Sequence, residues 1–152
     1  MIGMTHKEIQ QRLKNLGNAQ HASVSQRFFK TGPGQYGEGD VFIGVRVPVL
    51  RKLVKEYLAL PLKDVQSLLR SKIHEERLMA LLILVDKFKK GEPSIKKDIY
   101  DLYLKSTPFV NNWDLVDASA EHIVGAYLRD KNKTALQRLA KSDNLWERRI
   151  SI

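Results

Sequence analysis

The sequence predicts an all-α fold, an α-solenoid in which antiparallel helix pairs stack on one another. Apolar residues recur with helical periodicity from one end of the 152-residue chain to the other. Short turns that contain glycine, proline, asparagine or serine separate the periodic segments. Residues 65–77 also align with residues 136–148 without a gap, which indicates an internal repeat. The one β-like fragment, residues 40–47, is short and flanked by glycine, so we expect no strand.

Turn residues place the boundaries in the first half of the chain. Gly17 and Asn18 end the first helix, and a glycine-rich loop that reaches Gly44 follows the second. Pro48 and Pro61 then stand at first-turn positions, where proline is well tolerated. The predicted helices of this half are residues 5–16, 22–29, 48–57 and 61–69.

The second half contains the longest apolar run, residues 78–85, which is far too short to span a bilayer. Gly91 ends the helix that contains this run. Asn112 is a predicted N-cap for a helix that begins at Trp113 and continues to about Leu128. The predicted helices of this half are residues 74–90, 93–106, 113–128 and 134–140, and a last one that begins near Leu145.

The aligned segments lie 71 residues apart and share identical residues at five positions. This offset is about two of the 33- to 47-residue units that are typical of helix-pair repeats. We therefore expect a single HEAT-like domain over residues 1–152, with a concave basic face suited to a long ligand. The identical pairs are Gln66/Gln137, Leu68/Leu139, Ser71/Ser142, Glu76/Glu147 and Arg77/Arg148.

Composition limits the partners. The formal net charge of +9 favours a polyanion, nucleic acid first and an anionic membrane second. No helix shows a clear basic amphipathic face, so we expect no membrane binding. The absence of cysteine excludes disulfides, thiolate metal sites and cysteine nucleophiles. With no apolar signal region at the N-terminus, a cytoplasmic location is expected.

The sequence supports neither a dinucleotide-binding site nor a metal site. Residues 32–37 fit G-x-G-x-x-G, but a predicted helix precedes them where a dinucleotide site needs a strand. The four histidines show no metal-ligand spacing, so we expect no metal and no cofactor.

The helix that begins at Trp113 carries the candidate site. Trp113 and Asp117 are spaced i and i+4, so they lie one above the other on the helix. Asp114 and Glu121 add further carboxylates nearby. These residues form either a functional carboxylate site in a basic groove or an edge of the core with a carboxylate near a helix N-terminus. Arg149 departs from the repeat, because its counterpart is Leu78, and departures favour function.

Four motifs together resemble the AlkD-like DNA alkylation-repair proteins, a family of HEAT-like-repeat DNA glycosylases that excise positively charged alkylated purines. The similarity extends from about Phe28 to the last residue. The motifs are VNNWDLVD at 110–117, HEERLMA at 74–80, YGEGD at 36–40 with GVRVP at 44–48, and NLWERR at 144–149.

The resemblance implies roles for individual residues. Asp117 matches the catalytic aspartate, Trp113 matches a tryptophan that contacts the sugar and backbone of the damaged nucleotide, and Arg149 matches an arginine near the lesion. The resemblance places Phe28 at a position where characterised members of the family have a tyrosine. We expect duplex DNA with alkylated purines as the partner, with further DNA contacts from Phe28, Lys30, Arg46, Asn112 and Arg148.

The resemblance also implies an early C-terminus, because family members continue with further helix pairs. An enzyme is expected, and the alternative is a non-catalytic HEAT-repeat scaffold or fragment that binds DNA or protein. Without a covering helix pair, Leu145, Trp146 and Ile150 are expected to be exposed. Self-association through this helix face, or disorder of the last residues, would follow.

Overall fold

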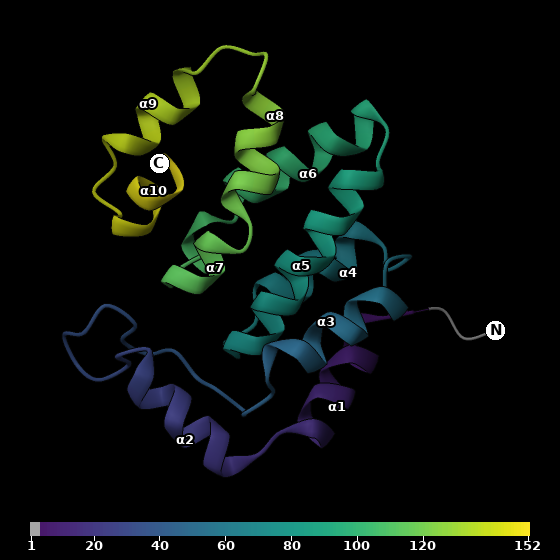
Figure 1. Ribbon diagram of the computed structural model, residues 1–152, viewed down its shortest axis with the longest axis vertical. Coiled ribbons are helices and arrows are strands. Elements are labelled where there is room, and N and C mark those ends of the chain that lie inside the picture. The colour runs from purple at the N-terminus through teal and green to yellow at the C-terminus, as the bar shows by residue number, and fades with distance from the viewer. Residues whose placement is uncertain (1–3) are drawn as a thin grey trace. The chain divides into compact units, whose positions relative to one another are not determined.

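The computed structural model describes residues 4–152, and these residues form helices joined by turns and loops (Figure 1). In this described part the β-structure is limited to an isolated bridge between Val41 and Ile73. The predicted all-α, helical-repeat class is therefore confirmed. Contacts divide the chain into two compact units, Met1–Ile83 and Leu84–Ile152, so that the boundary falls inside one long helix.

The first unit begins with α1 (His6–Leu16), which Thr5 caps by accepting a hydrogen bond from the backbone N–H of Glu8. The second helix, α2 (Ala19–Phe28), begins three residues earlier than predicted. Its start is fixed by Asn18, whose side-chain oxygen accepts from the N–H of His21. The other helices of this unit are α3 (Val47–Glu56), α4 (Leu62–Leu69) and the first part of α5 (His74–Lys90).

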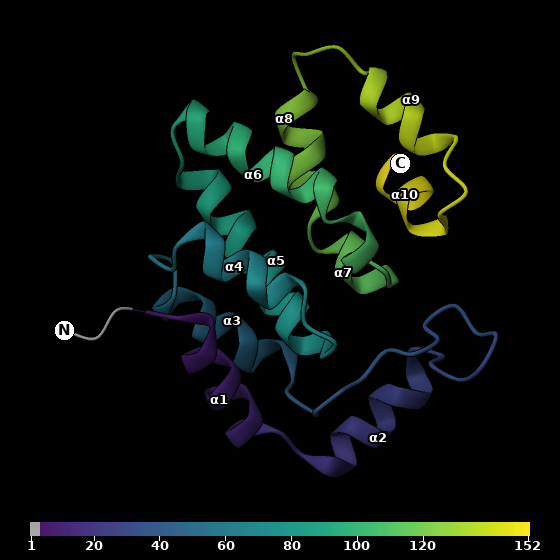
Figure 2. The ribbon, with the colours of Figure 1, turned by 180° about the vertical axis from the view of Figure 1, so that it is seen from behind.

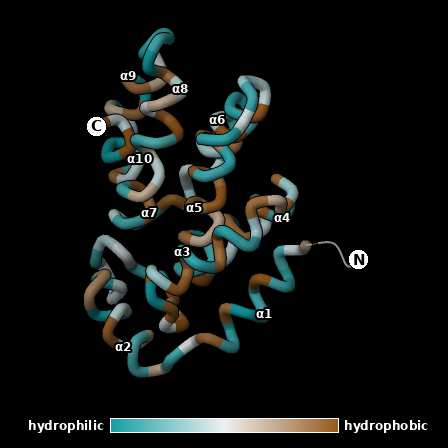
Figure 3. The backbone as a smooth tube through the Cα atoms, turned by 45° about the vertical axis from the view of Figure 1, so that its right-hand side comes forward, coloured by the Kyte–Doolittle hydropathy of each residue, from teal (hydrophilic) through white to brown (hydrophobic). Residues whose placement is uncertain are grey.

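Apolar residues on one side of each helix form the core of this unit. Ile9 and Leu13 of α1 are fully buried, and α1 packs on α4 (Figure 2). Hydrophobic and hydrophilic segments alternate along α1 in the tube coloured by hydropathy (Figure 3), as expected for a helix with one buried side.

Two carboxylates attach the long loop between α2 and α3 to the start of α5. Glu75 accepts hydrogen bonds from the backbone N–H groups of Ile43, Gly44 and Val45 at 2.8–3.2 Å. Asp40 lies 2.6 Å from Nδ1 of His74 and accepts from Arg77 at 2.8 Å. All three ionisable side chains of the Asp40 cluster are buried, so their mutual pairing removes the cost of burying isolated charge.

The second unit contains the remainder of α5 and the elements that follow it. They are α6 (Pro93–Lys105), the 3₁₀ helix η1 (Thr107–Phe109), α7 (Trp113–Asp117), the π-helix η2 (Glu121–Gly125), α8 (Ala126–Leu128), α9 (Thr134–Ala140) and α10 (Leu145–Ile150).

The predicted single helix over residues 113–128 is wrong, because a turn at Ala118 and Ser119 interrupts it. Ser119 is fully buried, and its hydroxyl donates to the carbonyl oxygen of Leu115 at 2.6 Å. Its backbone N–H bonds the carbonyl of Val116, three residues back, instead of a residue four back. Serine bonds of this kind bend helices, and the π-helix η2 follows immediately.

The structure confirms the internal repeat in detail. At the alignment offset of 71 residues, the end of α4 matches the end of α9, and the start of α5 matches the start of α10. The starts of α4 and α9 differ by one residue at this offset. Arg77 donates to the carbonyl of Ser71 at 3.0 Å, and Arg148 donates to that of Ser142 at 2.8 Å. The arginine shared by the two copies therefore holds the turn between the two helices of each pair.

Candidate active site

The short helix α7 positions Trp113 and Asp117. Asn112 is fully buried, and its side-chain oxygen accepts from the backbone N–H of Trp113 at 2.9 Å. Leu115 and Val116 are buried on the inner side of α7. This packing leaves Trp113 half-buried and Asp117 exposed, one helical turn apart.

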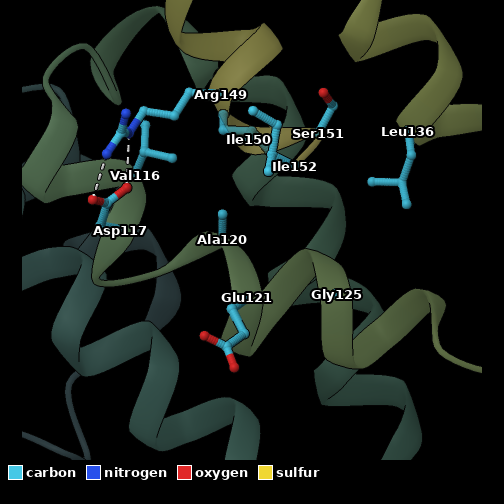
Figure 4. A pocket seen from close by; sticks show the side chains of 10 residues that line it. All are labelled: Val116, Asp117, Ala120, Glu121, Gly125, Leu136, Arg149, Ile150, Ser151 and Ile152. Atoms are coloured by element: carbon cyan, nitrogen blue, oxygen red, sulfur yellow. Dashed lines mark hydrogen bonds and ion pairs between the residues drawn. The ribbon is translucent and has the colours of Figure 1, made fainter.

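Asp117 forms a bidentate ion pair with Arg149 (Figure 4). Nε of Arg149 donates to Oδ1 of Asp117 at 2.8 Å, and Nη2 donates to Oδ2 at 2.6 Å. The side chain of Asp117 is 47% exposed and that of Arg149 is 44% exposed. Solvent therefore reaches the carboxylate even though both of its oxygens accept a hydrogen bond. The hydrogen bonds from Arg149 to Asp117 raise the pKa of the guanidinium above its ordinary value.

Arg149 reaches Asp117 because α10 packs on α7. Asn144 caps α10 by accepting from the N–H groups of Trp146 and Glu147. Ile150 is buried, which corrects the prediction that it would be exposed; Leu145, at 48%, is exposed as predicted, and Trp146 is half-buried. The apolar contact made by Ile150 anchors the last turn of α10, from which Arg149 projects.

Arg148 and Arg149 have different local partners. Arg148 bonds the Ser142 carbonyl, whereas Arg149 bonds Asp117. The neighbouring Glu147 accepts from the hydroxyls of Ser142 and Thr107. These two hydrogen bonds lower the pKa of Glu147 and attach α10 to the residues before α7.

A pocket of about 560 Å³ lies beside the ion pair. Glu121 is exposed at its edge, and its carboxylate points away from Asp117 and Arg149 (Figure 4). The carboxylates of Asp117 and Glu121 therefore do not converge on one point. Apolar side chains make up much of the wall, among them Val116, Ala120, Leu136, Ile150 and Ile152.

Three of the predicted DNA-contacting residues lie in the first unit. Phe28, the last residue of α2, is 60% exposed and packs edge-to-face on Phe29 with ring centroids 5.1 Å apart. Lys30 is exposed and has a left-handed backbone conformation, with φ of 55°. Arg46 is exposed before α3, with Nη2 at 2.8 Å from Nε2 of His21.

The sequence did not predict two hydrogen bonds made by residues on either side of α7. One joins Tyr103 to Ser119, and the other joins Thr107 to Glu147. Tyr103 is fully buried, and this burial raises the pKa of its hydroxyl. Each bond joins residues far apart in the chain, and periodicity gives no signal for such pairs.

Within residues 4–152, no cluster of three or more histidine and carboxylate side chains has the arrangement of a metal site. No helix in this range is both long enough and apolar enough to cross a membrane.

Comparison with known proteins identifies a family. The model of a protein family described as "DNA alkylation repair enzyme" matches residues 9–152. A search of curated proteins finds no match.

Proposed function

Because the chain belongs to the family of DNA alkylation repair enzymes, we propose that it binds alkylated duplex DNA and hydrolyses the N-glycosidic bond of cationic purines. The proposed substrates are purines alkylated at N3 or N7. Family membership supports the DNA repair role, and the Asp117 site supports the hydrolytic chemistry.

The observation that carries the proposal is an exposed carboxylate that is held in a fixed orientation one helical turn from a tryptophan. Two hydrogen bonds from Arg149 fix the plane of the Asp117 carboxylate, and Trp113 lies one turn away on the same helix. A carboxylate that serves only to stabilise a core would be buried, and this one is nearly half exposed.

The proposed substrate explains why one carboxylate is enough. An N3- or N7-alkylated purine carries a positive charge, so it can leave as a neutral base without being protonated. The bond between the base nitrogen and C1′ breaks, and its electron pair goes to the base. A water oxygen then bonds to C1′, and the proton that this water loses passes to Asp117 or to solvent.

Asp117 would act on the positive charge that develops on the sugar. A preorganised carboxylate stabilises an oxocarbenium ion electrostatically, and effects of this type are typically worth about 3 kcal/mol. Trp113 would add the π face of its indole, which attracts cations. Arg149 would orient Asp117 and offer its remaining N–H donors to the DNA backbone.

The other predicted residues fit supporting roles in this proposal. Phe28, Lys30, Arg46 and Arg148 are exposed and would contact the sugar or phosphates of the duplex. The buried Asn112 would act by capping α7 and so positioning Trp113.

A second candidate function is a non-catalytic scaffold that binds DNA or protein. The observation in its favour is that Arg149 occupies both oxygens of Asp117. In that case the ion pair would serve only to join α7 to α10.

Release of 7-methylguanine and 3-methyladenine from alkylated duplex DNA distinguishes the two functions. We expect Asp117→Asn to reduce base release by about 100-fold, because removing one preorganised electrostatic group has effects of this size. Asp98→Asn removes an exposed carboxylate of α6 and serves as the matched control. Equal release by the wild-type protein and Asp117→Asn would exclude catalysis by Asp117. Tight binding of alkylated duplex without any base release would support the scaffold.

A further inference from the structure

The second unit contains a further pocket, lined by basic side chains, in addition to the pocket beside Asp117. Its volume is about 690 Å³, and it is lined by residues of α5, of the first turns of α6, of α8 and of the segment that follows α8. It shares no lining residue with the pocket beside Asp117. Its charged and aromatic lining includes Phe88, Lys96, Lys97, Tyr127, Arg129 and Lys131.

Positive charge predominates in this second pocket. Asp130 is the only acidic residue in the described lining. Lys97 is neutralised by Asp101, whose Oδ2 lies 2.7 Å from Nζ. Within residues 4–152, no ion pair forms at Lys96, Arg129 or Lys131. Three cations therefore share one depression, and an anion bound there would reduce their mutual repulsion.

Aromatic rings hold two of these cations in position. Nζ of Lys131 lies 4.2 Å from the ring centroid of Tyr127 and donates to the carbonyl oxygen of the same residue at 3.0 Å. The Tyr127 ring stacks on Tyr100 with centroids 4.2 Å apart, which fixes its position. Nζ of Lys96 lies 5.4 Å from the ring centroid of Phe88. The cations are therefore partly ordered before any ligand arrives, which lowers the entropy cost of binding.

We propose that this pocket binds backbone phosphates of nucleic acid and adds an electrostatic contact remote from the Asp117 site. This inference rests on the proposed function only in taking DNA as the polyanion. Clustered basic side chains suit an extended phosphate backbone, which proteins bind through its charge.

A lipid surface with negative charge would also attract these cations, but the pocket lacks the other feature that such binding needs. A membrane-binding surface projects apolar side chains into the lipid beside its cations. Here Phe88 is buried and Tyr127 is half-buried, so the rings lie beneath the cations.

The test compares two triple variants that lose the same net charge. The first combines Lys96→Ala, Arg129→Ala and Lys131→Ala. The control combines Lys7→Ala, Lys14→Ala and Lys63→Ala, which are exposed residues of the other unit. Binding of an unmodified fluorescent DNA duplex is measured by anisotropy between about 50 and 200 mM salt. Thermal unfolding of both variants checks that they fold.

We expect the pocket variant to lower the slope of log K against log salt by about 2 to 3, since each lost phosphate contact lowers it by about 1. The control should change the slope by clearly less. Equal slopes for the two variants would overturn the inference, as would a wild-type protein that does not bind the duplex. Loss of binding to anionic vesicles with an unchanged DNA slope would also overturn it, in favour of a membrane.

Base release is measured separately on the same proteins, so the two proposals can fail independently. A pocket-dependent salt slope without base release would contradict the glycosylase function and support the phosphate site. Base release together with equal salt slopes for the two triple variants would support the glycosylase function and contradict the phosphate site.

Discussion

The hydroxyl of Tyr103 lies 2.8 Å from Oγ of Ser119, and both side chains are fully buried. Ser119 in turn donates to the carbonyl of Leu115, in the middle of α7. A buried chain of two hydrogen bonds therefore joins α6 to the turn that ends α7. This chain determines where the helix stops, and Asp117 is the last residue before that stop.

Removing the hydroxyl of Tyr103 should destabilise the protein. Tyr103→Phe leaves the buried Ser119 with one partner fewer, and we expect the free energy of unfolding to fall by about 1–2 kcal/mol in urea denaturation. Ser119→Ala and the double variant complete a double-mutant cycle. Strictly additive effects in that cycle would show that the two side chains do not interact.

Gly44 should tolerate no side chain. Its φ is +85°, and a Cβ atom there would lie 2.0 Å from the backbone oxygen of Asn18. We expect Gly44→Ala to lower the free energy of unfolding by at least about 3 kcal/mol, because backbone strain and steric overlap add. Gly34→Ala is the matched control: φ there is +75°, and no atom lies within 4 Å of the added Cβ. A similar loss for both variants would mean that strain alone limits position 44.

The contact between α1 and α4 should weaken in acid. Asp64 accepts hydrogen bonds from Nδ1 of His6 at 2.7 Å and from the backbone N–H of His6 at 3.2 Å. These bonds lower the pKa of Asp64 below its ordinary value of 3.8. A lowered pKa contributes stability that is present above the ordinary value and is lost as the pH falls through the folded-state value.

Asp64→Asn tests this dependence. We expect the variant to be less stable than the wild-type protein at pH 7, and the difference to shrink as the pH falls from about 5 towards 2. Urea denaturation across that range measures it. A difference that stays constant with pH would show that the ionisation of Asp64 does not contribute.

Substitutions of Arg149 and of Arg148 should differ in their effects on base release. Arg149→Ala removes both hydrogen bonds to Asp117, yet the pair is largely exposed, so we expect the stability to change by less than about 1 kcal/mol. Base release should fall at least about tenfold, because Asp117 loses its fixed orientation. Arg148→Ala, which removes the bond to the Ser142 carbonyl, is the comparison. Greater loss of base release in Arg148→Ala than in Arg149→Ala would contradict our assignment of the two arginines.

Local signals in the sequence predicted most of the helix boundaries. The capping residue Asn112 and the glycine after α5 act on their immediate neighbours, so they can be recognised without a structure. The repeat alignment went further and paired Arg148 with Arg77, and both arginines donate to the carbonyl of the equivalent serine. The start of α2 was missed because Ala19, Gln20 and His21 carry no apolar periodicity.

The site could be predicted only as separate parts. Trp113 and Asp117 share a helix, so their spacing placed them together, whereas Asp117 and Arg149 are 32 residues apart. Their pairing depends on how α10 packs on α7, and local patterns do not encode that packing. The break at Ser119 was missed for the same reason, because its partner Tyr103 lies on another helix.

Under the proposed function, the bidentate contact between Arg149 and Asp117 has a consequence for inhibitor design. A small cationic sugar mimic would have to compete with a guanidinium that is tethered beside its target at high effective concentration. An inhibitor with a cation for Asp117 and a neighbouring anion for Arg149 would instead keep both protein charges paired. Such zwitterionic inhibitors should therefore bind more tightly than cationic sugar mimics of the same size.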